Sequence, residues 1–276
     1  MNGEDRDVLQ GEETDRAGSP GAKAELPEVR RLEAVSFRSW PASTTTFDGT
    51  WAIRLTAGHP SKRLNSVNPL DPADHADLEH RIARAARRFA SFGRPLVFRQ
   101  SPLAPADLEN ILDARGWRRF DETIVMTRTL AADAPADVPR LPVADVGRWI
   151  DACVAMGSVD MATKPGLSEL IAHVEGAVGL FLIEDDAGKP LAALMAVRFS
   201  ELVGLFEVVV HPDMRGHGFG RQIVADALAW ARHGGARRAW LQVVSDNEPA
   251  LGLYRSLGFE EVYRYAYRQA PDGWTG

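Results

Sequence analysis

Residues 208–221 read Val-Val-Val-His-Pro-Asp-Met-Arg-Gly-His-Gly-Phe-Gly-Arg and join a strand to a helix. The run Leu205–Val210 carries three consecutive valines, which predicts a strand buried on both faces. The glycines at 216, 218 and 220 let the backbone approach a ligand closely. The first N–H groups of the next helix are unpaired, and its dipole favours an anion. The segment therefore predicts a pyrophosphate site, with an ordinary tight turn as the alternative.

A second informative segment, residues 241–259, reads Leu-Gln-Val-Val-Ser-Asp-Asn-Glu-Pro-Ala-Leu-Gly-Leu-Tyr-Arg-Ser-Leu-Gly-Phe. Its β-branched start predicts a strand. Asn247 is placed to cap a helix that has a proline in its first turn, and Gly258 stops that helix. Together with a helix face that ends at Gly234, the order of elements predicts a mixed α/β fold with one phosphate-type crossover.

The two segments together resemble the acetyl-CoA-binding core of the GCN5-related N-acetyltransferases. Residues 215–220 resemble that family's pyrophosphate loop, Arg-x-x-Gly-x-Gly, and residues 247–259 resemble its later helix. The resemblance covers about residues 140–268. It implies a mostly antiparallel central sheet flanked by helices, and acetyl-CoA as the co-substrate.

Carried over residue by residue, the resemblance also implies which groups hold acetyl-CoA. The pantetheine amides would pair with the strand Val208, Val209 and Val210, and with Asn247. The pyrophosphate would be held by Arg215, Gly216, His217, Gly218, Phe219, Gly220 and Arg221. Tyr254 would protonate the leaving thiolate, with a packing role as the alternative. The acetyl group would pass directly to an amine, and no metal is expected.

The base that activates the amine is the point at which this chain departs from its family. A lysine-type amine has a pKa of about 10.4 in water and must lose a proton before it attacks. Related enzymes often carry a glutamate where this chain has Gln242. We take Glu207 as the substitute, with a surface carboxylate as the alternative. We interpret His211 as a turn residue, and His217 as a phosphate contact or a solvent-facing side chain.

The first half repeats the order of elements with which the second half ends. A strand over 95–99, a helix over 105–115, Gly116-Trp117 and a strand over 123–130 follow one another. We interpret residues 29–130 as a degenerate copy of the same fold that lacks the glycine loop. Residues 131–139, rich in Ala, Pro and Asp, are the predicted linker, and 140–276 the complete catalytic domain.

Two basic stretches of the first half are candidates for binding. The cluster 62–68 (Lys-Arg-Leu-Asn-Ser-Val-Asn) is expected near the cleft between the copies, with a self-satisfied loop as the alternative. Arg81, Arg84 and Arg88 line one face of a helix predicted over 74–92. That stripe is a solvated surface or a site for an anionic partner.

Composition excludes several classes of protein. Apolar residues make up 45% and charged residues 25% of 276 residues, which is typical of a globular chain with a real core. Residues 1–28 carry eight acids against three bases, which predicts a disordered acidic tail. The remaining near-neutral body argues against nucleic-acid binding. No apolar run reaches the roughly 18 residues of a membrane span.

We expect a cytoplasmic protein, in which the lone Cys153 is a buried hydrophobe rather than a nucleophile.

The sequence thus predicts an acetyl-CoA-dependent N-acetyltransferase that acts on a primary amine of a small molecule or a protein. Gln242 keeps open a CoA-binding sensor without turnover, and the arginine helix keeps open an interaction module. Asp151, Asp160 and Glu175 are acids that could attract a cationic amine or be solvated. Both a monomer and a homodimer are compatible with two copies in one chain.

Overall fold

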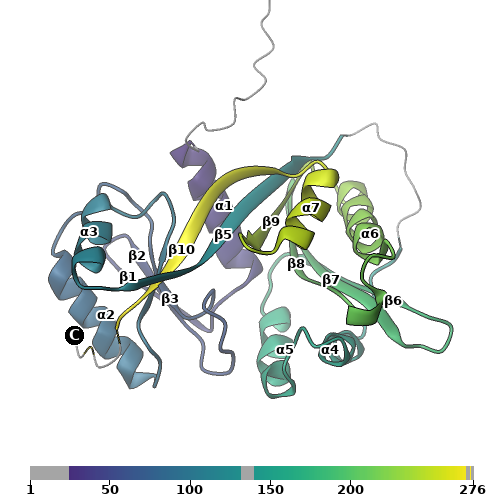
Figure 1. Ribbon diagram of the computed structural model, residues 1–276, viewed down its shortest axis with the longest axis horizontal. Helices are drawn as coiled ribbons and strands as arrows, with labels where there is room; N and C mark the ends of the chain where they lie inside the picture. Colours follow the sequence, from purple (N-terminus) through teal and green to yellow (C-terminus); the bar gives the residue numbers. More distant parts are fainter. Residues whose placement is uncertain (1–24, 132–139, 272–273, 275–276) are drawn as a thin grey trace, which may run out of the picture.

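The computed structural model describes residues 25–131, 140–271 and 274. These residues form a ten-stranded, mostly antiparallel sheet flanked by helices, so the expected mixed α/β fold is confirmed (Figure 1). The strands are β1 Thr44–Asp48, β2 Trp51–Leu55, β3 Ser66–Pro69, β4 Val97–Gln100, β5 Arg118–Thr129, β6 Ala177–Glu184, β7 Pro190–Phe199, β8 Leu202–Val210, β9 Arg238–Val244 and β10 Glu260–Gln269. The α-helices are α1 Leu26–Ser39, α2 Leu78–Ser91, α3 Ala106–Ala114, α4 Val146–Ala155, α5 Lys164–Ala172, α6 Phe219–His233 and α7 Glu248–Ser256, and the 3-10 turns are η1 Met161–Thr163 and η2 Pro212–Met214.

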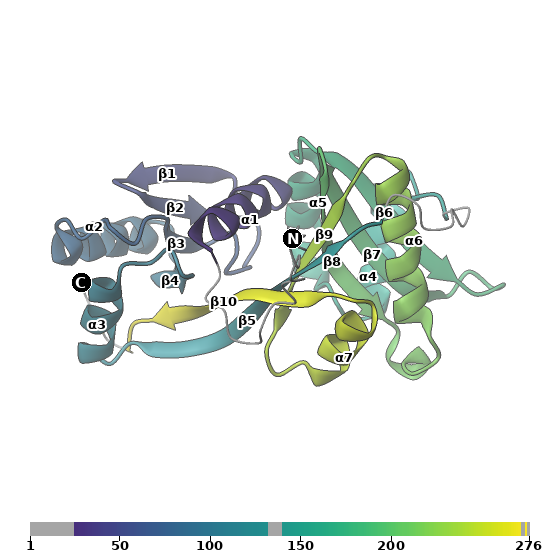
Figure 2. The ribbon, with the colours of Figure 1, turned by 90° about the horizontal axis from the view of Figure 1, so that it is seen from above.

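The strand order interleaves the two halves of the chain. It runs β1-β2-β3-β4-β10-β5-β9-β8-β7-β6. Strand β5, the last of the first half, lies between β10 and β9 of the second half. Strand β10, the last of the second half, lies between β4 and β5 of the first half. Figure 2 shows these two long strands running side by side from one lobe to the other. One sheet therefore continues through both predicted domains.

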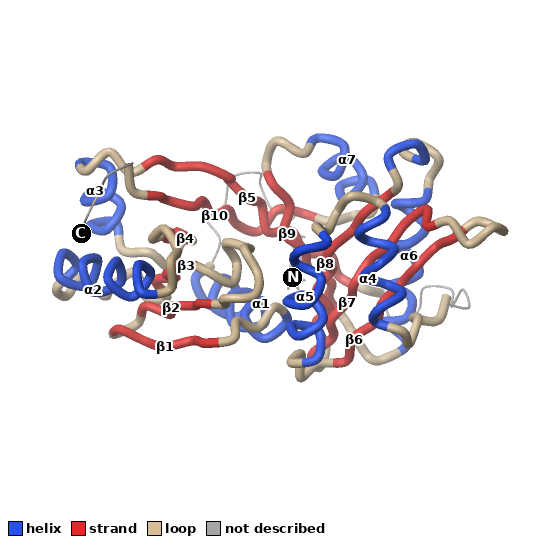
Figure 3. The backbone as a smooth tube through the Cα atoms, turned by 90° about the horizontal axis from the view of Figure 1, so that it is seen from below, coloured by secondary structure: helices blue, strands red, loops and turns tan. Residues whose placement is uncertain are grey.

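Alternating side chains give the sheet two apolar faces in the second half. On β6, Leu180 and Leu182 pack in the cluster that includes residues of α4 and α5. Phe181 and Ile183 pack in the cluster that includes residues of α6. This alternation is what a strand with helices on both sides requires. In the first half, α2 and α3 pack with β2 and β4 in a third cluster (Figure 3).

The N-terminal boundary differs from the expectation. Helix α1 begins at Leu26, so residues 26–28 are helical and their assignment to the disordered tail is wrong. Pro27 occupies the first turn, where no N–H is required, and Val29 and Leu32 begin a buried face. The rest of the predicted tail, up to residue 24, and residues 132–139 of the predicted linker lie outside the described residues. None of the helices in the described part of the chain combines the length and apolarity that crossing a bilayer requires.

Candidate active site

A β-bulge opens the sheet at the end of β8. Strands β8 and β9 run parallel and pair from Leu202↔Arg238 to Leu205↔Leu241, where the ladder ends. Opposite β7, the register of β8 shifts between Phe206 and Val209, and Glu207 lies in the shifted stretch with a left-handed φ of 47°. A bulge bends its strand and leaves an extra residue out of the ladder. Residues 207–210 are therefore half-buried, and the expectation of burial on both faces fails for this part of the strand.

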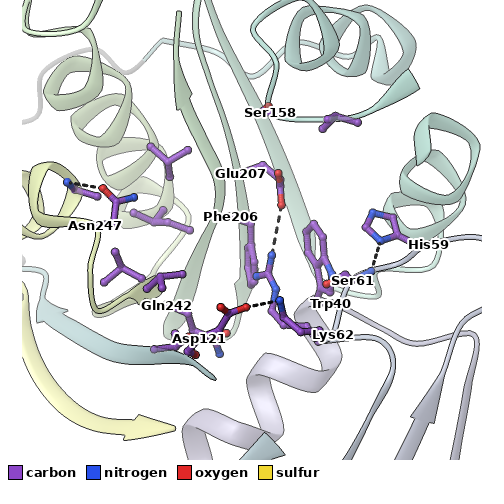
Figure 4. Close-up of a pocket in the computed structure, with 18 of the residues that line it drawn as sticks. Trp40, His59, Ser61, Lys62, Asp121, Ser158, Phe206, Glu207, Gln242 and Asn247 are labelled. Atoms are coloured by element: carbon purple, nitrogen blue, oxygen red, sulfur yellow. Dashed lines mark hydrogen bonds and ion pairs between the residues drawn. The ribbon is translucent and has the colours of Figure 1, made fainter. Parts of the chain in front are cut away.

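A cavity of about 600 Å³ lies where β8 and β9 separate (Figure 4). The second half contributes β8, the end of β9, the start of α7 and residues 158–167 to its wall. The first half contributes Trp40, the loop 59–63 and Asp121 of β5. Of the residues predicted to catalyse the reaction or to bind acetyl-CoA, four line this cavity: Glu207, Val208, Asn247 and Tyr254. Because strands of both halves meet here, both halves contribute to the site.

Glu207 projects from the bulge into this cavity. Its side chain is 19% exposed and forms an ion pair with Arg63 Nη2 at 3.4 Å. Burial raises the pKa of Glu207, and the Arg63 guanidinium partly offsets that rise. The nearby Cys153 is buried, as expected, and burial together with the Glu207 charge raises the pKa of its thiol to about 12. Glu207 is thus suited to hold a proton, whereas Cys153 is not suited to act as a thiolate.

Helix α7 supplies the other two predicted side chains of the cavity wall. Tyr254 is 6% exposed and packs edge-on against Phe259, with ring centroids 5.9 Å apart. Burial raises the pKa of its hydroxyl to about 12, so the proton is retained at neutral pH. The Asn247 Oδ1 accepts a hydrogen bond from the Ala250 N–H at 3.2 Å and caps the helix. That bond leaves the Asn247 Nδ2 group available as a donor.

The glycine loop lies beyond the cavity, between the end of β8 and α6. Gly216 and Gly218 have φ values of 80° and 87°, and a Cβ atom at either residue would meet no atom within 4 Å. Glycine is therefore required by backbone conformation here and not by crowding. The first intrahelical bond of this segment runs from the Gln222 N–H to the Gly218 carbonyl at 3.0 Å. The N–H groups of the first turn of α6 thus remain open to a ligand, beside the exposed Arg221.

His211 and His217 both contact backbone atoms two residues away. The Nδ1 of His211 accepts a hydrogen bond from the Asp213 N–H at 3.3 Å, so the interpretation of His211 as a turn residue is confirmed. The exposed His217 ring lies with its Nδ1 3.0 Å from the Arg215 carbonyl oxygen.

Gln242 is held at both ends. Its Oε1 accepts a hydrogen bond from the Tyr265 hydroxyl at 3.0 Å, and its Nε2 donates to Ser36 Oγ at 3.0 Å. These bonds connect β9 with β10 and α1 along the cavity wall. The Gln242 amide therefore joins three elements at this position. The sequence marks the departure from the family pattern but gives no signal for these distant partners.

In the basic cluster 62–68, some residues line the cavity and others stabilise their own loop, so each of the two alternative interpretations holds for part of the cluster. Lys62 and Arg63 line the cavity between the halves, as predicted. The two asparagines instead satisfy their surroundings: Asn65 Nδ2 donates to the His59 and Ser61 carbonyls, and Asn68 Nδ2 donates to the Ala52 carbonyl. Lys62 pairs with Asp121, which has a left-handed φ of 46° where β5 changes register against β10. Sequence reasoning missed Asp121, because a bulge on β5 depends on its partner strand.

The arginine stripe on α2 is not simply a solvated face. Arg81 has a side chain only 4% exposed and pairs with Asp74 at 2.9 Å and Asp48 at 3.5 Å. Arg84 pairs with Asp48 at 2.9 Å and Asp77 at 3.1 Å. The solvated interpretation is therefore wrong for Arg81. These two guanidinium groups are already neutralised by carboxylates at the start of their own helix and in the β1–β2 turn.

Comparison with known proteins identifies the family. Residues 27–268 match the family described as "Probable histone acetyltransferase Rv0428c C-terminal". The chain belongs to this acetyltransferase family. The uncharacterized N-acetyltransferase YobR of Bacillus subtilis is 26% identical to this chain over 250 residues, which span 88% of this chain and 99% of YobR.

Solved structures confirm the fold of this family member. A GCN5-related N-acetyltransferase from Kribbella flavida superposes with a TM-score of 0.66 at 20% identity, and the match covers 88% of this chain and 96% of that one. A tandem GNAT protein from the clavulanic acid biosynthesis pathway superposes with a TM-score of 0.62 at 16% identity, over 89% of each chain. The fold is that of the GCN5-related N-acetyltransferases.

Proposed function

We propose that this chain is an N-acetyltransferase that moves an acetyl group from acetyl-CoA to the primary amine of an acceptor. The observation that supports it most is one cavity, opened by the β8 bulge, that holds a carboxylate, a protonated phenol and a capping amide. The family match and the fold point to the same chemistry. The first-half residues, in this proposal, no longer bind CoA and serve to complete the acceptor side of the cavity.

The residues present fit the proposed co-substrate. The β9 side of β8 is free of strand pairing after Leu205, so the backbone of residues 206–210 can pair with the amides of a pantetheine arm. Asn247 offers an amide donor on the opposite wall. The open first turn of α6 and the flanking Arg215 and Arg221 suit a pyrophosphate. The thioester of acetyl-CoA supplies the acetyl group and a thiolate leaving group.

Two side chains then divide the proton transfers. Glu207 removes a proton from the acceptor ammonium, and the neutral amine attacks the thioester carbonyl carbon. As the C–S bond breaks, the Tyr254 hydroxyl gives its proton to the departing sulfur. The Tyr254 phenolate then takes a proton from the nitrogen of the product, which at that stage carries one proton more than the neutral amide. The net change is one proton released from Glu207 to solvent for each amide formed.

The CoA-binding sensor is the second candidate, and Gln242 is the residue that favours it. A glutamine amide is not a general base, so turnover in this proposal depends on Glu207. The family description names a histone acetyltransferase, and a protein lysine is therefore one acceptor class to be tested.

The test measures two properties of one preparation. Thiol release from acetyl-CoA is followed with a broad panel of amines, and thermal stabilisation by acetyl-CoA is recorded in parallel. Turnover with one class of amine supports the enzyme. Stabilisation without turnover favours the sensor. The absence of both signals would overturn the assignment of the glycine loop as well.

A further inference from the structure

The first-half wall of the cavity, where we place the acceptor, includes the loop 59–63, which three polar side chains hold in place. The buried Asn65 accepts a hydrogen bond from the Thr56 N–H at 2.9 Å and donates to two loop carbonyls. Arg94 donates to the carbonyls of residues 56, 57 and 59. The buried Arg54 donates to the Arg63 carbonyl at 2.8 Å. A loop fixed at so many carbonyls presents its side chains in a defined geometry.

Arg63 is the side chain of this loop that meets Glu207. Its guanidinium lies over the Trp40 ring, 4.6 Å from the centroid, and 5.9 Å from the centroid of Phe206. Among the described residues, its side chain donates one hydrogen bond, the contact with Glu207 at 3.4 Å. A guanidinium has five N–H donors, so most of those of Arg63 have no partner in the part of the protein that the structure describes. The aromatic rings fix its plane, and 27% of the side chain is exposed.

The other charged side chains of the cavity wall, Lys62, Asp121 and Asp160, are more exposed than Arg63 and Glu207. Lys62 forms an ion pair with Asp121 and lies over the Tyr267 ring. Asp160 accepts a hydrogen bond from the Ala162 N–H at 3.0 Å as the cap of η1. Arg63 and Glu207 are therefore the half-buried charged pair of this wall, where a ligand that displaces water gains most from a charged contact.

The position of Arg63 limits which amine can reach Glu207. An acceptor ammonium that donates a hydrogen bond to Glu207 also comes close to the Arg63 guanidinium, because Arg63 contacts the same carboxylate. The two positive charges then repel one another. An anion next to the amine removes this repulsion, because Arg63 can bind it through two parallel N–H groups. A carboxylate matches that planar fork. A zwitterion would thus replace one ion pair by two and leave the net charge of the cavity unchanged.

We propose that the acceptor is a small amino acid, whose amine is received by Glu207 and whose neighbouring carboxylate is bound by Arg63. This inference rests on the proposed acetyltransferase function and adds the class of acceptor. The cavity volume of about 600 Å³ lies within the range of small-molecule sites. Arg63, from the half without the glycine loop, becomes the residue that selects the acceptor.

The experiment compares matched amines on the full-length protein. The probes are the twenty common L-amino acids, their carboxamides, the amines that lack the carboxylate, and a histone-tail peptide whose lysines have no adjacent carboxylate. Thiol release from acetyl-CoA gives kcat/KM for each. We expect the best amino acid to exceed its own carboxamide by about 10- to 100-fold, the size of a charge-assisted hydrogen-bonded contact. Arg63→Gln is expected to bring that ratio near one, chiefly through KM, and Arg63→Lys to restore part of it.

The control variant is Lys189→Gln, which removes one positive charge from the exposed β6–β7 turn. It should leave the ratio of acid to carboxamide unchanged. Equal or better turnover of carboxamides, plain amines or the peptide by the wild type would overturn this inference and leave the acetyltransferase intact. So would an Arg63→Gln variant that keeps the wild-type ratio. Absence of thiol release with every probe overturns the proposed function together with the inference.

Discussion

Burial and Arg63 act on the Glu207 carboxyl group in opposite directions. Burial raises its pKa, and the guanidinium lowers it in part. Because a general base works only when ionised, kcat/KM is expected to rise with pH through this raised pKa. Arg63→Gln should move that limb to higher pH, since the cation that stabilises the carboxylate is gone. Glu207→Gln should lose the limb and about 100-fold or more in rate. The measurement is kcat/KM against pH for the three proteins, and an unchanged limb in Glu207→Gln would move the base elsewhere.

Tyr254 is expected to act through its hydroxyl and not through its ring. Tyr254→Phe keeps the packing against Phe259 and removes the proton donor. We expect kcat to fall on the order of 100-fold, while the KM for acetyl-CoA changes little. Since the pKa of this hydroxyl is about 12, it should stay protonated throughout the assay range. Steady-state kinetics with a fixed acceptor decide the point, and a wild-type kcat would assign the acid to another group.

The residues that sequence reasoning found and missed differ in how far away their partners lie. Asn247 and Tyr254 belong to one short helix, and spacing alone marks them. The partner of Glu207 is 144 positions away, and Gln242 and Ser36 are 206 positions apart. Pairs of that kind are created by strand order, which a local pattern does not contain. The sequence therefore points to the wall formed by β8 and α7, where we propose that acetyl-CoA binds. It gives less information on the wall formed by Trp40, the loop 59–63 and Asp121, where we propose that the acceptor binds.

The glycine loop offers a matched pair of substitutions at the scale of one element. Gly218 and Gly188 have φ values of 87° and 80°, and a Cβ atom at either residue would meet no atom within 4 Å. A valine at either position should cost roughly 1–3 kcal/mol of folding free energy through backbone strain. Only Gly218→Val should weaken acetyl-CoA binding, because Gly188 lies in the distant β6–β7 turn. Thermal unfolding with and without acetyl-CoA separates the two effects, and equal affinities would contradict the loop assignment.

Helix α1 is attached to the sheet by a buried ion pair. Glu33 contacts Arg99 of β4 and accepts a hydrogen bond from the Tyr263 hydroxyl of β10. Both charged side chains are 3% exposed or less. Glu33→Gln leaves a buried cation unpaired and should cost about 3–5 kcal/mol. The double variant Glu33→Gln/Arg99→Met should recover part of that loss. Denaturant unfolding measures both, and a single variant within about 0.5 kcal/mol of wild type would show that the pair is dispensable.

Elements with clear end signals were predicted, and elements without them were not. Helices α6 and α7 have a regular apolar face or a capping residue, and both were expected at these positions. Helix α5 was missed: it has nine residues, contains Gly166 and has no side-chain cap at Thr163. Strand β5 starts at Arg118, five residues earlier than expected. Its pairing with β10 as far as Arg118↔Gln269 extends it beyond its own β-branched stretch.

At the scale of the whole molecule, the repeated order of strand, helix and strand was visible in the sequence, whereas the exchange of last strands was not. Residues 29–130 and 140–276 are predicted as two domains joined by a linker. Instead, β5 pairs with β9 from Thr123↔Val244 to Thr129↔Arg238, and β10 pairs with β4 around Ala266↔Gln100. An exchange satisfies the same alternation of apolar residues as two separate sheets would. Composition and periodicity therefore cannot distinguish the two arrangements.

The exchanged strands predict that the two halves unfold together. Strands β5 and β10 pair from Glu260↔Thr127 to Gln269↔Arg118, and each also borders a strand of the other half. Opening either half breaks ladders that stabilise the other, so we expect one calorimetric transition with a calorimetric-to-van't Hoff enthalpy ratio near one. Acetyl-CoA, although bound by the second half in our proposal, should move the whole transition to higher temperature. Glu33→Gln should move all of it downwards. Two transitions, of which acetyl-CoA shifts only one, would mean that the halves are independent domains despite their shared sheet.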